Sequence, residues 1–131
     1  MSETEAITSL LERYAMALNN SDTDAVMHLY TADGVFMPQH FPSSVGAAEV
    51  RKAYENIFQT IQLTVKFHIE EAQSVSPEWA FARTNSAGTV LGHATKESSA
   101  EANQELFVLH KVEGEWKIAR YCLSTTNPPR V

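Results

Sequence analysis

The sequence has a single cysteine, Cys122, and no long apolar run, and these absences exclude several classes of protein. One thiol cannot form an internal disulfide, which fits a reducing compartment, so we expect a cytoplasmic protein. No segment approaches the roughly 20 apolar residues that a membrane span requires. The opening residues, MSETEAITSLL, lack the basic and apolar regions of a signal peptide.

Basic residues are also scarce, with 10 Lys and Arg against 16 Asp and Glu and a formal net charge of −6. Phosphate backbones and anionic membrane surfaces repel such a chain, so we expect no nucleic-acid and no membrane partner. The five histidines do not stand in a metal-binding spacing, and Gly-rich phosphate motifs and the G-x-S-x-G motif are missing. We therefore expect no structural metal and no cofactor.

The periodicity of apolar residues changes once along the chain. Helical spacing predicts helices over residues 3–19, after the capping residue Asp22, and over 47–59, with a short strand at 35–37. From residue 61 the period becomes two, which predicts four hairpin-linked strands: 61–69, 79–90, 101–112 and 116–124. This order predicts one α+β domain over residues 1–131, with three N-terminal helices packed on a strongly curved antiparallel sheet. Such a sheet leaves a cavity at its open end, where a ligand would lie.

Several short motifs occur in a characteristic order: YAMALN (14–19), DTDAV (22–26), LYTADGVF (29–36), residues 46–54 and EGEWKIA (113–119). Together they resemble the nuclear transport factor 2-like superfamily in its SnoaL-like and ketosteroid-isomerase-like branch, and most of all the SgcJ/EcaC type. The resemblance implies a cone-shaped, cystatin-like barrel, a small-molecule ligand and frequent homodimers. Functions within the superfamily are diverse, so the fold does not settle this chain's activity.

The isomerase branch can be compared residue by residue. Tyr14 falls where ketosteroid isomerases keep the tyrosine that donates to the developing oxyanion. The position of the catalytic base falls near Met37 and Pro38, and that of the second acid near Phe107; none of these side chains can transfer a proton. We therefore expect no ketosteroid isomerisation.

The association domain of calcium/calmodulin-dependent kinase II offers a second comparison. Ala80-Phe81-Ala82-Arg83 resembles the strand of that domain that carries a pocket arginine, and Tyr121-Cys122 and Pro128 resemble its C-terminal strand and tail. A further pocket arginine of that domain corresponds to Phe107 here. A non-catalytic association module is thus one alternative function.

Arg83 is the one cation on an otherwise apolar strand, between Phe81 and Asn85 at alternating positions. We predict that it points into the cavity, because an unpaired buried charge is costly and requires an acceptor there. The acceptor would be a ligand carboxylate held by two hydrogen bonds, or an internal acid such as Glu105.

Glu105 and Asn103 share a strand face with Phe107. A carboxyl beside aromatic rings can have a raised pKa and act as acid or base; alternatively it forms a salt bridge or faces a dimer partner. Tyr14 and Tyr54 lie on inner helix faces, where they line a pocket floor or pack in the core. The predicted ligand-binding residues are Tyr14, His40, Tyr54, Arg83, Asn103, Glu105 and Phe107.

Three other polar residues have simpler interpretations. His40 lies in a loop that can rim the cavity or be solvated. Asp33 before Gly34 is interpreted as a turn residue rather than a base. Cys122 is interpreted as a small buried apolar residue.

The sequence favours a small-molecule-binding domain with a partly apolar pocket. An acid/base enzyme of isomerase, cyclase or dehydratase type on a small apolar metabolite is the main alternative, and the association module is the second. We also predict a homodimer joined through the outer sheet face, where Thr64, Lys66 and His68 alternate with core residues.

Overall fold

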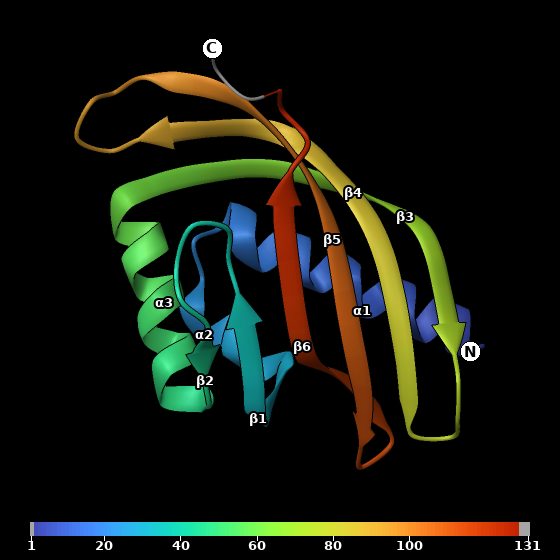
Figure 1. Cartoon of the computed structure of the whole chain (residues 1–131). Coiled ribbons are helices and arrows are strands. Elements are labelled where there is room, and N and C mark those ends of the chain that lie inside the picture. The colour runs from blue at the N-terminus through green and yellow to red at the C-terminus, as the bar shows by residue number, and fades with distance from the viewer. Residues whose placement is uncertain (1, 129–131) are drawn as a thin grey trace.

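The computed structural model describes residues 2–128 and has the predicted α+β fold (Figure 1). In chain order the elements are α1 (Glu3–Asn19), α2 (Thr23–His28), β1 (Tyr30–Met37), β2 (Ser44–Val45), α3 (Ala47–Thr60), β3 (Ile61–Ser74), β4 (Trp79–Gly92), β5 (Ser98–Val112) and β6 (Glu115–Thr125). Among the described residues, no helix is long and apolar enough to cross a membrane.

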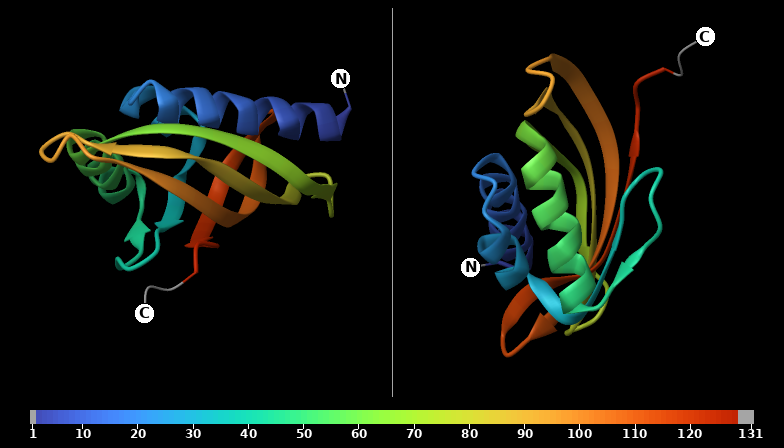
Figure 2. Two further views of the ribbon diagram at one scale, coloured as in Figure 1. Left: turned by 90° about the horizontal axis from the view of Figure 1, so that it is seen from above. Right: turned by 90° about the vertical axis from the view of Figure 1, so that its left-hand side faces the viewer.

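Side chains cap the first two helices, the second of them at the predicted residue Asp22. The Ser2 hydroxyl accepts a hydrogen bond from the Glu5 backbone N–H at 3.1 Å, and the Asp22 carboxylate accepts one from the Ala25 N–H at 3.1 Å. These bonds satisfy N–H groups that have no partner within the helix. The two longer helices, α1 and α3, lie on the same side of the sheet (Figure 2).

The six strands form one curved sheet in the order β2-β1-β6-β5-β4-β3. All neighbouring pairs are antiparallel except β1 and β6, which run parallel. The sheet is therefore mixed rather than wholly antiparallel, and it does not close into a complete barrel, because β2 and β3 form its two edges. Its long strands β3, β4 and β5 bend over the helices (Figure 2).

The predicted turn at Asp33 and Gly34 is wrong, because both residues lie within β1. The pairing of β1 with β6 shifts register between Tyr30 and Val35, so the two residues form an irregularity in the strand. A Cβ on Gly34 would lie 2.7 Å from the Tyr30 ring, which explains the need for glycine there. The strand begins at Tyr30, earlier than predicted, so Tyr30 belongs to β1 rather than to the expected second helix.

Candidate functional site

A cavity of about 890 Å³ lies between the helices and the concave face of the sheet. Its mouth is bounded by the loop from Pro38 to Ser43, and α1, α3 and the strands β3 to β6 contribute its walls. Most of the lining is apolar or aromatic; it includes Leu18, Phe36, Ala53, Ile57, Leu63, Val65, Phe67, Val90, Tyr121 and Leu123. This size and composition suit a compact organic molecule.

Glu105 is the buried acid of the cavity wall, with only 4% of its surface exposed. One carboxyl oxygen accepts a hydrogen bond from the Thr84 hydroxyl at 2.6 Å, and the other accepts one from the Ser86 hydroxyl at 2.5 Å. Burial raises the pKa of the Glu105 carboxyl, and these two hydroxyls partly oppose that rise. The site therefore holds a carboxyl poised to exchange a proton or to gain a charged partner.

A chain of tyrosine hydroxyls lies across the cavity floor. The Tyr54 hydroxyl is 2.7 Å from that of Tyr14 and 2.6 Å from that of Tyr30. The three residues come from α1, β1 and α3, so tertiary packing alone brings them together. Burial raises the pKa of each hydroxyl well above its usual value, so all three keep their protons at neutral pH.

Counting the hydroxyl protons shows which hydrogen bonds the three tyrosines can still form. Two hydrogen bonds among three hydroxyls use two protons, which leaves one proton for a further acceptor. Tyr14 and Tyr54 line the cavity, whereas Tyr30 is not among the lining residues. When Tyr30 donates to Tyr54 and Tyr54 donates to Tyr14, the Tyr14 hydroxyl can donate either to the neighbouring Tyr121 hydroxyl or to a ligand oxygen.

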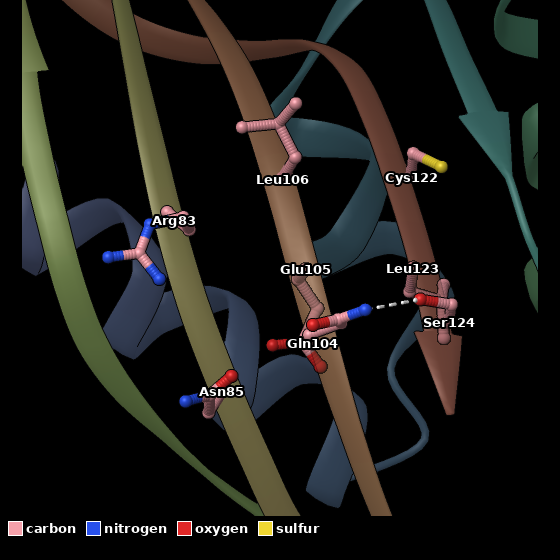
Figure 3. A pocket seen from close by; sticks show the side chains of 8 residues that line it. All are labelled: Arg83, Asn85, Gln104, Glu105, Leu106, Cys122, Leu123 and Ser124. Atoms are coloured by element: carbon pink, nitrogen blue, oxygen red, sulfur yellow. Dashed lines mark hydrogen bonds between the residues drawn. The ribbon is translucent and has the colours of Figure 1, made fainter. Parts of the chain in front are cut away.

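The prediction that Arg83 points into the cavity is wrong. Arg83 lies on the outer face of β4, where its side chain is 55% exposed and its Nε is 3.3 Å from a carboxyl oxygen of Glu71 (Figure 3). The residues of β4 that face the helices are small and buried: Ala80, Ala82, Thr84 and Ser86. Arg83 therefore holds neither a ligand in the cavity nor Glu105.

Two further predictions about inner residues need correction. Cys122 is exposed on the outer face of β6 rather than buried (Figure 3). Phe107 is fully buried, but it is not among the cavity-lining residues. Its ring stacks on that of Tyr121 with 4.2 Å between centroids, so it supports the wall from behind rather than contacting a ligand.

The remaining predicted residues lie together around the cavity. Tyr14, Tyr54, Asn103 and Glu105 all line it, and exposed His40 lies at its mouth, with its Nε2 2.9 Å from the Gln39 side-chain nitrogen. The positions near the expected isomerase base carry no carboxylate, since Pro38 and Gln39 are the lining residues there. Within residues 2–128, no three His, Cys, Asp or Glu side chains cluster in a way that could hold a metal ion.

Several polar groups around the cavity were not predicted from the sequence, among them Thr84, Ser86, Tyr30 and Tyr121. Thr84 and Ser86 alternate with Arg83 and Asn85, so they lie on the other face of the strand. Two small hydroxyl residues on one strand face could have indicated that this face meets a buried acid. Tyr30 and Tyr121 carried no such signal, because their partners lie far away in the sequence.

Comparison with known proteins identifies the family. The SnoaL-like domain matches residues 7–128, which is nearly the whole chain. This chain belongs to the SnoaL-like domain family. No match was found among curated proteins.

Solved structures agree with this assignment of the SnoaL-like domain. A ketosteroid isomerase-like protein from Erwinia carotovora atroseptica is 37% identical, with a TM-score of 0.92 and coverage of 97% of this chain and 98% of that chain. Two more distant structures share the fold. A candidate scytalone dehydratase from Novosphingobium aromaticivorans has 20% identity, a TM-score of 0.84 and coverage of 95% and 85%. A protein with a cystatin-like fold from Caulobacter vibrioides has 19% identity, a TM-score of 0.80 and coverage of 95% and 90%.

Proposed function

We propose that this SnoaL-like domain binds a small, largely apolar molecule that carries one hydrogen-bonding group. The observation that carries the proposal is the cavity of about 890 Å³, which has aromatic walls and contains both Glu105 and the tyrosine chain. Apolar surface supplies most of the binding free energy in such a site, while a few polar groups fix the orientation of the ligand.

Filling the cavity is expected to abolish binding. Ala53 on α3 lines the cavity and is half-buried, so Ala53→Trp places an indole ring where the ligand would lie. Saturation-transfer NMR with a library of small apolar and aromatic fragments should detect binders of the wild type that this variant loses. We expect the variant to bind these fragments at least about tenfold more weakly than the wild type, which corresponds to a loss of about 1.4 kcal/mol of binding free energy.

The matched control is Ala48→Trp, because Ala48 lies on the same helix but is exposed and does not line the cavity. Circular dichroism and thermal unfolding would verify that both variants fold. Binding that survives Ala53→Trp, or a wild type that binds no fragment, would contradict the proposed function.

Acid/base catalysis is a second candidate, and the buried Glu105 carboxyl favours it. Its raised pKa lets the Glu105 carboxyl keep a proton to a higher pH than an ordinary glutamate does, while the Tyr14 hydroxyl can stabilise negative charge that develops on a ligand oxygen. The candidate scytalone dehydratase shares this fold at 20% identity, which supports the fold and leaves the reaction open. Following the bound fragments by NMR over hours would reveal any chemical conversion.

We further infer a homodimer formed through the outer sheet face. Leu106 and Trp79 are 48% and 42% exposed there, and the Trp79 ring stacks on that of His110 with 4.1 Å between centroids. Arg83 and Glu71 put both signs of charge on the same face, so a two-fold axis can pair the arginine of one copy with the glutamate of the other.

The sequence motifs also favour the SgcJ/EcaC type, and the lone free thiol favours a cytoplasmic location.

Charge placed at the centre of this face is expected to break the dimer. Leu106→Glu buries two like charges at the interface, so light scattering coupled to size-exclusion chromatography should shift from dimer to monomer. Met16→Glu is the control, because Met16 is 62% exposed on α1, away from the sheet. A wild type that is monomeric at micromolar concentration, or a Leu106→Glu variant that stays dimeric, would contradict the proposed interface.

A further inference from the structure

The charges around the cavity have one sign. The acidic residues among its lining are Glu49, Glu101 and Glu105, and the described lining contains neither lysine nor arginine. Glu49 and Lys52 form an exposed ion pair at 3.4 Å, so that acid already has a partner. His40, at the mouth, is the remaining titratable nitrogen of the lining.

Among the residues that the structure describes, Glu105 has hydrogen-bond donors but no counter-charge. Its two contacts are the hydroxyls of Thr84 and Ser86, and within residues 2–128 no Lys, Arg or His forms an ion pair with it. Burying a carboxylate without a cation is costly, and this cost appears as the raised pKa of Glu105. A ligand that supplies a cation at this point would lower that cost, whereas a ligand carboxylate would increase it.

The surrounding rings add to this preference. Tyr14, Phe36, Phe67 and Tyr121 all line the cavity. The faces of Phe36 and Tyr121 are stacked on neighbouring rings, which leaves Tyr14 and Phe67 to attract an organic cation. The net charge of −6 also draws cations rather than anions toward the protein. Aromatic walls around one unpaired carboxyl are a suitable receptor for an ammonium group attached to an apolar body.

The geometry points to a protonated organic amine with an apolar or aromatic body as the ligand, and its ammonium group pairs with Glu105. This inference rests on the proposed function, because it names the ligand class of the same cavity. The sequence analysis expected a ligand carboxylate, because it placed Arg83 in the cavity. With Arg83 on the outer face, an ammonium group takes the place of that carboxylate. The amine binds in the cavity with its body against the aromatic wall.

Three probes with one indole body test this choice: tryptamine, which is cationic, tryptophol, which is neutral, and indoleacetate, which is anionic. Isothermal titration calorimetry with the full chain at low salt and mildly alkaline pH should give the tightest binding for tryptamine. We expect tryptamine to bind about tenfold or more tightly than tryptophol, with indoleacetate weaker still.

Glu105→Gln should reduce tryptamine affinity about tenfold or more, to the level of tryptophol, while the affinity for tryptophol changes little. The amide can still bond the hydroxyls of Thr84 and Ser86, which protects the fold. Glu12→Gln is the control for net charge alone, because Glu12 is exposed on α1 and does not line the cavity. It should leave the order of the three probes unchanged.

The pH dependence provides an independent readout. Tryptamine affinity should fall as the pH drops through the pKa of Glu105, because the protonated carboxyl loses the ion pair; tryptophol affinity should not. Tyr14 from α1 and Tyr121 from β6 lie close enough to interact with Glu105, and both remain neutral over this range because burial raises the pKa of each. Glu49, Glu101 and His40 also face the cavity, so the pH dependence assigned to Glu105 must be absent in Glu105→Gln.

The possible outcomes separate this inference from the proposed function. Equal or tighter binding of tryptophol or indoleacetate overturns the amine and keeps a small-molecule cavity. Tryptamine affinity unchanged in Glu105→Gln also overturns it. If no indole probe binds while other fragments bind in the NMR screen, the amine inference fails and the proposed function stands; if no fragment binds either, both fail.

Discussion

Replacing Gly88 with alanine should lower the free energy of unfolding by about 3 kcal/mol, because an added methyl group would overlap a neighbouring main chain. Gly88 lies on β4 opposite Val65 of β3, and a Cβ there would lie 1.9 Å from the Thr64 carbonyl oxygen and 2.9 Å from the Val65 Cα. Backbone atoms cannot move aside as a flexible side chain can. The close approach occurs between Ser86 and Val90, which both line the cavity, so glycine allows β3 to curl over β4 at the cavity wall.

Gly92→Ala on the same strand is the matched control. A Cβ at Gly92 would meet the Thr95 hydroxyl at 2.6 Å, and that side chain can rotate away. Urea unfolding followed by circular dichroism should give a loss of less than about 1 kcal/mol for this variant. Equal losses for Gly88→Ala and Gly92→Ala would show that the backbone overlap does not set the curvature of the sheet.

Removing the central hydroxyl of the tyrosine chain is expected to be the second largest effect. Tyr54→Phe takes a partner from both Tyr14 and Tyr30, and a buried hydroxyl left without its bond costs about 1–3 kcal/mol. We therefore expect a loss of about 2–4 kcal/mol in the free energy of unfolding. The substitution keeps the ring, which stacks on Phe36 with 4.6 Å between centroids, so packing is largely preserved.

Tyr30→Phe separates the hydroxyl chain from general effects of tyrosine removal. It deletes an end of the chain, and Tyr54 keeps its bond to Tyr14, so the loss should be about 1 kcal/mol. Urea unfolding of both variants and of the double variant measures the coupling between the two sites. Similar losses in the two single variants would contradict a hydroxyl chain centred on Tyr54.

Local sequence determined the secondary structure and much of the sheet. The predicted helix over residues 3–19 matches α1, because capping residues and helical spacing act over a few positions. Alternation along β5 correctly placed Glu105 on the core side, since Phe107 and Leu109 on that face are large and buried. The family assignment also came from the sequence and is confirmed for the SnoaL-like domain.

Only the tertiary structure decided which face of β4 is inside. Alternation shows which residues share a face, but not which face meets the helices, and both faces of β4 carry apolar residues. The larger pair, Trp79 and Phe81, suggested that Arg83 points inward. The small residues Ala80 and Ala82 are the buried ones instead, and Trp79 is 42% exposed.

The tyrosine chain was likewise beyond local sequence information. Its hydrogen bonds join residues 24 and 40 positions apart, from one strand and two helices, and no local pattern encodes contacts over that distance. The sequence alone determined the three helices, the four long strands, their order and the inward face of Glu105. The curvature of the sheet and the packing of α1 and α3 decided which side chains meet in the cavity, because side chains distant in the sequence become neighbours only when the elements pack.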